Sequence, residues 1–138
     1  MTVRPLRLLG DPVLRTPCDP VVRFDDALAR LVGDLLDTVA EPGRAGLAAN
    51  QIGSGLAVFA YNVEGELGYL INPRVVELGR NVDGPEGCLS IPGVSATRSR
   101  ADHAAKRAHR IRPASLLARR LFRCVQRVRH IFEGRRPA

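Results

Sequence analysis

Two short segments of the chain combine residue types that can do chemistry. The first runs Gly46-Leu47-Ala48-Ala49-Asn50-Gln51, and the second runs Glu86-Gly87-Cys88-Leu89-Ser90. A cysteine thiolate can bind a metal ion, a glutamine amide can donate hydrogen bonds, and a glycine lets another backbone approach closely. Taken alone, each segment also has an ordinary interpretation. A glycine-alanine segment is usually a tight packing turn, and a lone cysteine is usually a small buried hydrophobe.

In order and together, the two segments resemble the first two signature motifs of the peptide deformylase family. The family pattern is GxGLAAxQ, then EGCLS, then QHExDHLxG. Supporting matches lie at residues 10–15 and 70–73, so the resemblance covers roughly residues 6–94. The leading glycine of the first motif falls on Arg44, although Gly43 is adjacent, which is a departure at the entry to the substrate groove.

The resemblance implies a role for four residues. In the family, one cysteine and two histidines hold Fe²⁺ or Zn²⁺ and leave one position for the water that becomes hydroxide. Cys88 matches the cysteine ligand, while Gln51 and the backbone N–H of Leu89 match the two donors to the oxyanion that develops on the formyl carbon. Gly46 would let the substrate backbone approach closely. The implied reaction is hydrolysis of the formyl group from the N-terminal formyl-methionine of nascent peptides.

The third motif, with two histidines one helical turn apart and a glutamate as general acid/base, is absent. Residues 121–126 line up with the sequence that leads into it. In that register Arg127 falls on the first histidine, Val128 on the glutamate and Ile131 on the second histidine. Cys88 would then be the one remaining ligand. We therefore expect weak or no binding of iron or zinc, and impaired or absent activity.

The chain has three histidines that could replace the missing ligands, His103, His109 and His130. In the same register His130 is next to the second histidine position, so a one-residue slip could aim it at Cys88. His103 and His109 are six residues apart, a spacing that does not place them on one helical face. The more ordinary interpretation is that histidines in arginine-rich sequence are simply solvated.

Charge divides the chain sharply near residue 98. Up to Thr97 there are 8 basic and 12 acidic residues, whereas from Arg98 onward there are 13 basic and 2 acidic residues. A tail this basic favours an alternative function, a non-catalytic descendant of the family that binds peptide or ribosomal RNA. Contact of a basic amphipathic helix with a membrane surface is a weaker alternative. A reading-frame error or a decaying gene would also explain the change, and the DNA sequence in all three frames would distinguish it.

Hydrophobic periodicity predicts an α+β fold in a single domain, residues 1–138, with a basic, divergent portion at 98–138. The clearest element is an amphipathic helix near the N-terminus that Asp25 or Asp26 would cap. We also expect a buried strand at 56–61, an extended unit around the turn at Asn72 and a loop at 81–84. The family resemblance implies small antiparallel sheets around a C-terminal helix beneath Cys88.

Two further predictions concern the last third of the chain. Residues 98–113 have few large apolar residues and no alternation of period two, so we expect an irregular or poorly ordered region there. After Pro113, an apolar stripe at helical spacing predicts a basic amphipathic helix. Its members are Leu117, Leu121, Cys124, Val125, Val128 and Phe132.

Composition excludes several other classes of protein. No run of about eighteen apolar residues is present, so no transmembrane segment is expected, and the N-terminus lacks the apolar core of a signal peptide. A cytoplasmic protein is the default expectation. The cysteines, Cys18, Cys88 and Cys124, are odd in number and lack CxxC spacing. This pattern argues against a disulfide framework and a zinc ribbon.

Overall fold

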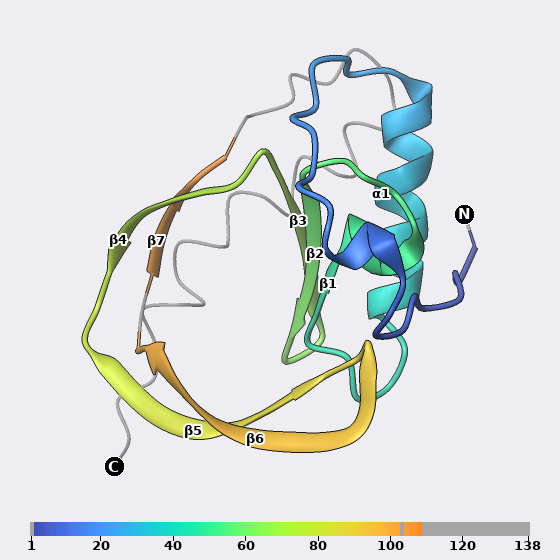
Figure 1. Ribbon diagram of the computed structural model, residues 1–138. Coiled ribbons are helices and arrows are strands. Elements are labelled where there is room, and N and C mark those ends of the chain that lie inside the picture. The colour runs from blue at the N-terminus through green and yellow to red at the C-terminus, as the bar shows by residue number, and fades with distance from the viewer. Residues whose placement is uncertain (1, 103, 109–138) are drawn as a thin grey trace.

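The computed structural model describes residues 2–102 and 104–108, which form the predicted α+β fold (Figure 1). Its helical elements are η1 (Pro12–Leu14), α1 (Asp26–Val39) and η2 (Ala49–Ile52). Its strands are β1 (Gly46–Ala48), β2 (Val58–Val63), β3 (Glu66–Ile71), β4 (Arg74–Leu78), β5 (Asn81–Cys88), β6 (Ile91–Ala101) and β7 (Ala104–Arg107). They pair antiparallel in three small sheets, β1-β2-β3, β4-β7 and β5-β6.

The helix α1 forms where the apolar spacing predicted it. Asp25 is the N-cap, and its carboxylate accepts hydrogen bonds from the backbone N–H groups of Ala27 and Leu28. The hydrogen bond from Leu28 is the largest of the effects that hold the pKa of Asp25 below its ordinary value. At the other end, the guanidinium of Arg44 donates to the carbonyl of Thr38 at 2.7 Å, which satisfies a carbonyl of the last helical turn. The departure of the first motif at Arg44 therefore has a local structural role.

The core lies between α1 and the sheet β1-β2-β3 (Figure 1). One face of α1 contributes Val32, Leu35 and Val39, which are at most 1% exposed. Across from them, Leu47 of β1 and Ala60 of β2 are completely buried. The predicted strand at 56–61 is confirmed with shifted bounds, since β2 starts at Val58 and ends at Val63. This small α/β sandwich is the rigid support for the first motif, which begins with β1 and continues into η2.

A tight corner at Asn72 joins β3 to β4, as the sequence predicted. Asn72 has a positive φ of 49°, a conformation that asparagine tolerates better than most residues. Its side chain accepts from the N–H of Val21 at 2.8 Å and donates to the carbonyl of Val21 at 2.9 Å. Asn72 thereby ties the N-terminal arm to the corner, across 51 residues of sequence.

The strands β5 and β6 form a long hairpin that leaves the core and returns to it at the hairpin's turn (Figure 1). The predicted loop at 81–84 is wrong, because these residues belong to β5 and pair with residues 98–101 of β6. The prediction that residues 98–113 are irregular is also wrong for residues 98–101 and 104–107. Residues 98–101 lie in β6, and Ala104–Arg107 form β7, paired with β4. Residues 109–113 are outside the described part of the chain.

The physical reason for these errors is that β5 and β6 are exposed on most positions. A strand that packs no side chains into a core needs no apolar alternation, because its backbone groups are satisfied by the neighbouring strand. Ion pairs support the ladders instead, with Arg100 bound to Glu86 and Arg80 bound to Asp102. For residues 98–101 the pattern correctly excluded a core strand, but it did not exclude an exposed one.

The outlying strands also carry apolar side chains that face solvent. Val75, Val76 and Leu78 of β4 are 57%, 59% and 64% exposed, and Val82 and Val94 are 49% and 57% exposed. The predicted C-terminal helix, with its apolar stripe, lies outside the described residues.

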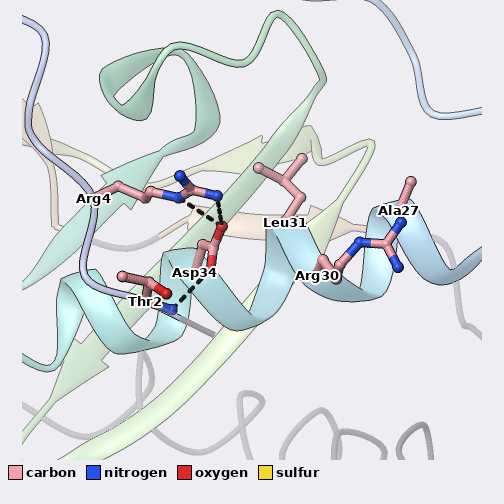
Figure 2. A pocket seen from close by; sticks show the side chains of 6 residues that line it. All are labelled: Thr2, Arg4, Ala27, Arg30, Leu31 and Asp34. Atoms are coloured by element: carbon pink, nitrogen blue, oxygen red, sulfur yellow. Dashed lines mark hydrogen bonds and ion pairs between the residues drawn. The ribbon is translucent and has the colours of Figure 1, made fainter.

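The N-terminal arm packs on the outer side of α1 around Asp34. The carboxylate accepts from the backbone N–H of Thr2 at 2.9 Å and from Nε of Arg4 at 2.8 Å (Figure 2). A shallow depression of about 360 Å³ lies beside this cluster, and it contains none of the predicted site residues. It is lined by Thr2, Arg4, Ala27, Arg30, Leu31 and Asp34.

This cluster predicts a pH dependence of stability. Burial alone would raise the pKa of Asp34, but the hydrogen bonds from Arg4 and Thr2 and the charge of Arg4 outweigh it, so the pKa lies below its ordinary value of 3.8. A carboxyl group whose pKa is lower in the folded state stabilises the fold at any pH above its pKa in the unfolded state. This contribution to the free energy of unfolding is lost as the pH falls through the pKa of the folded state.

We expect Asp34→Asn to reduce the free energy of unfolding by about 1 kcal/mol at pH 7, since Arg4 is half-exposed and solvent weakens the pair. The difference between the two proteins should shrink as pH falls below about 4. Urea titrations of both proteins at several pH values measure this difference. A difference that stays constant down to pH 3 would contradict a stabilising role for the ionised carboxylate of Asp34.

Candidate functional site

The first motif places Gln51 in the short helical turn η2. Gly53, with a φ of 89°, ends this turn in the left-handed conformation that glycine adopts without strain. The side-chain oxygen Oε1 of Gln51 accepts from the backbone N–H of Ala48 at 3.0 Å. Because an N–H can only donate, this bond identifies which end of the amide is the oxygen. The NH₂ end of Gln51 therefore points away from Ala48.

The second motif lies at the turn between β5 and β6. Cys88 pairs with Ile91, which leaves Leu89 and Ser90 as a two-residue turn. Leu89 packs against the core and Ser90 is only 5% exposed, whereas Cys88 is exposed. The turn is thus anchored in the protein by the residues that follow the cysteine, while Cys88 is exposed.

The structure brings the two motifs together. Nε2 of Gln51 donates to Oγ of Ser90 at 3.1 Å, across 39 residues of sequence. The N-terminal arm holds both partners by its backbone. The N–H of Arg7 donates to the carbonyl of Gln51 at 2.8 Å, and the N–H of Leu9 donates to the carbonyl of Ser90 at 2.9 Å. Gln51 therefore lies beside the turn that follows Cys88.

Two N–H groups at this junction have no acceptor within residues 2–102 and 104–108. One is the backbone N–H of Leu89, which lies outside the ladder of β5 and β6, and the other is the second Nε2 hydrogen of Gln51. Donors that are held in place before a reaction stabilise an oxyanion at little reorganisation cost. The predicted roles of Gln51 and Leu89 stay predictions, but among the described residues nothing accepts from either of these two N–H groups.

Gly46 has a packing reason to be glycine. A Cβ atom at this position would lie 2.9 Å from Cζ of Phe59, closer than real Cβ contacts allow. A side chain at position 46 would therefore require the end of the Phe59 ring to shift. The predicted role of Gly46 in admitting a substrate backbone stays untested beside this structural role.

An ion pair crosses the hairpin two residues before Cys88. Nε of Arg100 donates to both carboxylate oxygens of Glu86, at 2.8 and 3.0 Å. This hydrogen bond, together with the charges of Arg100 and Arg98, holds the pKa of Glu86 below its ordinary value, and the same bond raises the pKa of Arg100. Glu86 is therefore ionised and engaged at neutral pH, so it is poorly suited to serve as a proton donor.

The donor set for a metal ion does not fit the family's requirement. Within residues 2–102 and 104–108, no group of three His, Cys, Asp or Glu side chains could hold a metal ion. Cys88 contributes one thiol. The positions that the third motif assigns to the other ligands, Arg127 and Ile131, lie outside the described residues, and their side chains offer no lone pair to a cation.

Sequence reasoning missed three contributors to the junction. Ser90 is part of the second motif, but no role was assigned to it, and the backbone contacts of Arg7 and Leu9 carry no side-chain signature. Its place as a hydroxyl residue at the end of the second motif was the signal that could have indicated Ser90. Arg100 lies in the portion predicted to be basic and divergent, and its ion pair with Glu86 was not predicted.

Comparison with solved structures places this fold among the peptide deformylases. A crystal structure of a peptide deformylase from Legionella pneumophila superimposes with a TM-score of 0.75 and 32% sequence identity, over 91% of this chain and 78% of that one. The fold class predicted from the sequence is confirmed by this likeness.

Sequence comparisons agree. The polypeptide deformylase family model matches residues 3–112. A peptide deformylase from Acidothermus cellulolyticus is 51% identical over 104 residues, which are 75% of this chain and 58% of the relative. Peptide deformylase 2 from Streptomyces coelicolor is 44% identical over 142 residues, with 96% of this chain and 79% of the relative covered. The chain belongs to the polypeptide deformylase family.

Coverage differs between the two ends of the chain. The family-model match extends past the predicted limit of the resemblance at residue 94 but stops at residue 112, before Arg127 and Val128. The chain spans a little over half the length of the Acidothermus cellulolyticus relative.

In the described residues, no helix is both long enough and apolar enough to cross a membrane.

Proposed function

We propose that this chain retains the substrate-orienting half of a peptide deformylase site and has lost the half that generates the nucleophile. The ligand class would be a peptide with an N-terminal formyl-methionine, whose formyl oxygen accepts from Gln51 and from the N–H of Leu89. Hydrolysis of the formyl group would be absent or strongly impaired. The observation that carries this proposal is the Gln51–Ser90 hydrogen bond at 3.1 Å, which holds the first motif beside the second.

Two donors toward one oxygen can bind and polarise a formyl group, but they cannot supply a nucleophile. Water near neutral pH needs a metal ion or a general base to attack an amide-like carbon. Cys88 is the one family ligand that the sequence retains, and Val128 stands where the family has its acid/base glutamate. Loss of general acid/base catalysis alone typically costs about 10²–10⁴-fold in rate.

The test joins metal analysis to a formate-release assay on an N-formyl-methionyl dipeptide. We expect the purified chain to hold well under one iron or zinc per molecule, and to release no more formate than its Cys88→Ala variant. Cys18→Ala is the matched control, because it removes another free thiol of the chain without touching the second motif. Stoichiometric metal and formate release that both vanish in Cys88→Ala, and persist in Cys18→Ala, would overturn the proposal.

The second candidate is a non-catalytic descendant that contacts RNA through its basic portion. The concentration of 13 basic residues and 2 acidic residues from Arg98 onward favours it, since phosphate contacts dominate nonspecific binding of nucleic acid. The salt dependence of RNA binding separates this candidate from the first, because capture of a formyl peptide by Gln51 and Leu89 involves no counterion release.

A further inference from the structure

The amide of Gln51 is fixed at both of its ends. Oε1 accepts from the N–H of Ala48 at 3.0 Å, and Nε2 donates to Oγ of Ser90 at 3.1 Å. The first bond prevents the amide from flipping, because the N–H of Ala48 could not accept from an NH₂ group. The second bond uses one of the two Nε2 hydrogens. The other hydrogen has no acceptor among residues 2–102 and 104–108, and the planar amide sets its direction.

Ser90 is itself held firmly enough to act as an anchor. It is 5% exposed, and its carbonyl accepts from the N–H of Leu9 at 2.9 Å. The carbonyl of Gln51 accepts from the N–H of Arg7 at 2.8 Å, so one short stretch of the arm fixes the backbones of both partners. Their separation therefore depends on backbone contacts and not on flexible surface side chains.

We infer that Ser90 is a positioning residue for Gln51, a role that rests on the proposed function of the Gln51 amide as a donor to the formyl oxygen. A glutamine side chain has three rotatable bonds and loses considerable rotamer freedom when it is ordered. If Ser90 orders the Gln51 side chain before substrate binds, no entropy of ordering has to be lost when negative charge develops on the substrate. Donors that are ordered in advance in this way stabilise an oxyanion most effectively. Removal of the hydroxyl would take away one of the two hydrogen bonds described for the side-chain amide of Gln51 and leave the bond from Ala48.

The inference makes a direct prediction for the unaltered chain in solution. In ¹H–¹⁵N spectra recorded without peptide or added metal, the two Nε2 hydrogens of Gln51 should exchange with solvent at different rates. The hydrogen bonded to Ser90 should exchange at least about tenfold more slowly than its partner, because exchange requires that the bond open. Equal and fast exchange of both hydrogens would overturn the inference without any variant.

Variants that remove or keep the Ser90 hydroxyl also test whether this hydroxyl orders the Gln51 amide. In Ser90→Ala, we expect both hydrogens to exchange at the fast rate and the order parameter of the amide to fall below about 0.6, a value typical of flexible groups. Ser90→Thr keeps the hydroxyl and should restore the slow exchange. Ser95→Ala removes an exposed serine from the same hairpin and should change nothing at Gln51.

Persistence of slow exchange in a folded Ser90→Ala variant would overturn the inference. Failure of that variant to fold leaves the measurement on the unaltered chain as the decisive one. Because these spectra require neither hydrolysis nor bound peptide, metal-dependent formate release would contradict the proposed function while leaving the order of Gln51 to be judged separately.

Discussion

Metal binding should appear when the three missing side chains of the third motif are restored. We expect the triple variant Arg127→His, Val128→Glu and Ile131→His to bind about one iron or zinc per chain, because two imidazoles and the thiolate of Cys88 complete the ligand count of an open hydrolytic site. Formate release should rise at least about 100-fold above the parent chain, since both the nucleophile and the general acid/base are supplied. These positions lie outside the described residues, so their register comes from the sequence match alone.

Two controls make this result specific. Addition of Cys88→Ala to the triple variant should remove both metal and activity. The same motif displaced by eight residues, as Arg119→His, Arg120→Glu and Arg123→His, provides equal numbers of histidines and glutamates in another place. Equal metal binding by the displaced variant, or no binding by a folded triple variant, would contradict the proposed register.

Asn72→Ala should reduce the free energy of unfolding by about 3 kcal/mol. The substitution removes two hydrogen bonds and leaves the N–H and carbonyl of Val21 without partners, at a residue that is 5% exposed. Each unsatisfied buried group costs about 1–3 kcal/mol. An alanine with a φ near the observed 49° adds a conformational cost of about 1 kcal/mol.

Asn72→Gly separates the two causes, because glycine adopts a positive φ without strain but cannot form either hydrogen bond. Asn72→Gly should reduce the free energy of unfolding by about 2 kcal/mol. This loss is smaller than that of Asn72→Ala because glycine avoids the cost of a positive φ. Asn81→Ala, at an exposed position of β5, is the matched control and should change stability by less than about 0.5 kcal/mol. Urea denaturation of the four proteins gives these differences, and equal losses in Asn72→Gly and Asn81→Ala would contradict the role of Asn72.

The sequence by itself determined the features whose signals are local. The cap at Asp25 and the apolar spacing from Leu28 to Val39 predicted α1 within a few residues, because a helix satisfies its backbone within its own segment. The turn at Asn72 was predicted from the Asn-Pro sequence, which is a local signal as well. The two motifs also identified the family, which the comparisons confirmed. The absence of histidines at positions 127 and 131 is a property of the sequence that no packing can change.

Only the tertiary structure decided the extent of β5 and β6 and the arrangement of the junction. A strand satisfies its backbone with a distant partner, so residues 98–101 form a strand because residues 81–84 pair with them, and not because of their own composition. The same holds for the contact of Gln51 with Ser90, where neither residue indicates the other across 39 positions. The core and the N-terminal arm set that distance, because they fix the two backbones before the side chains meet.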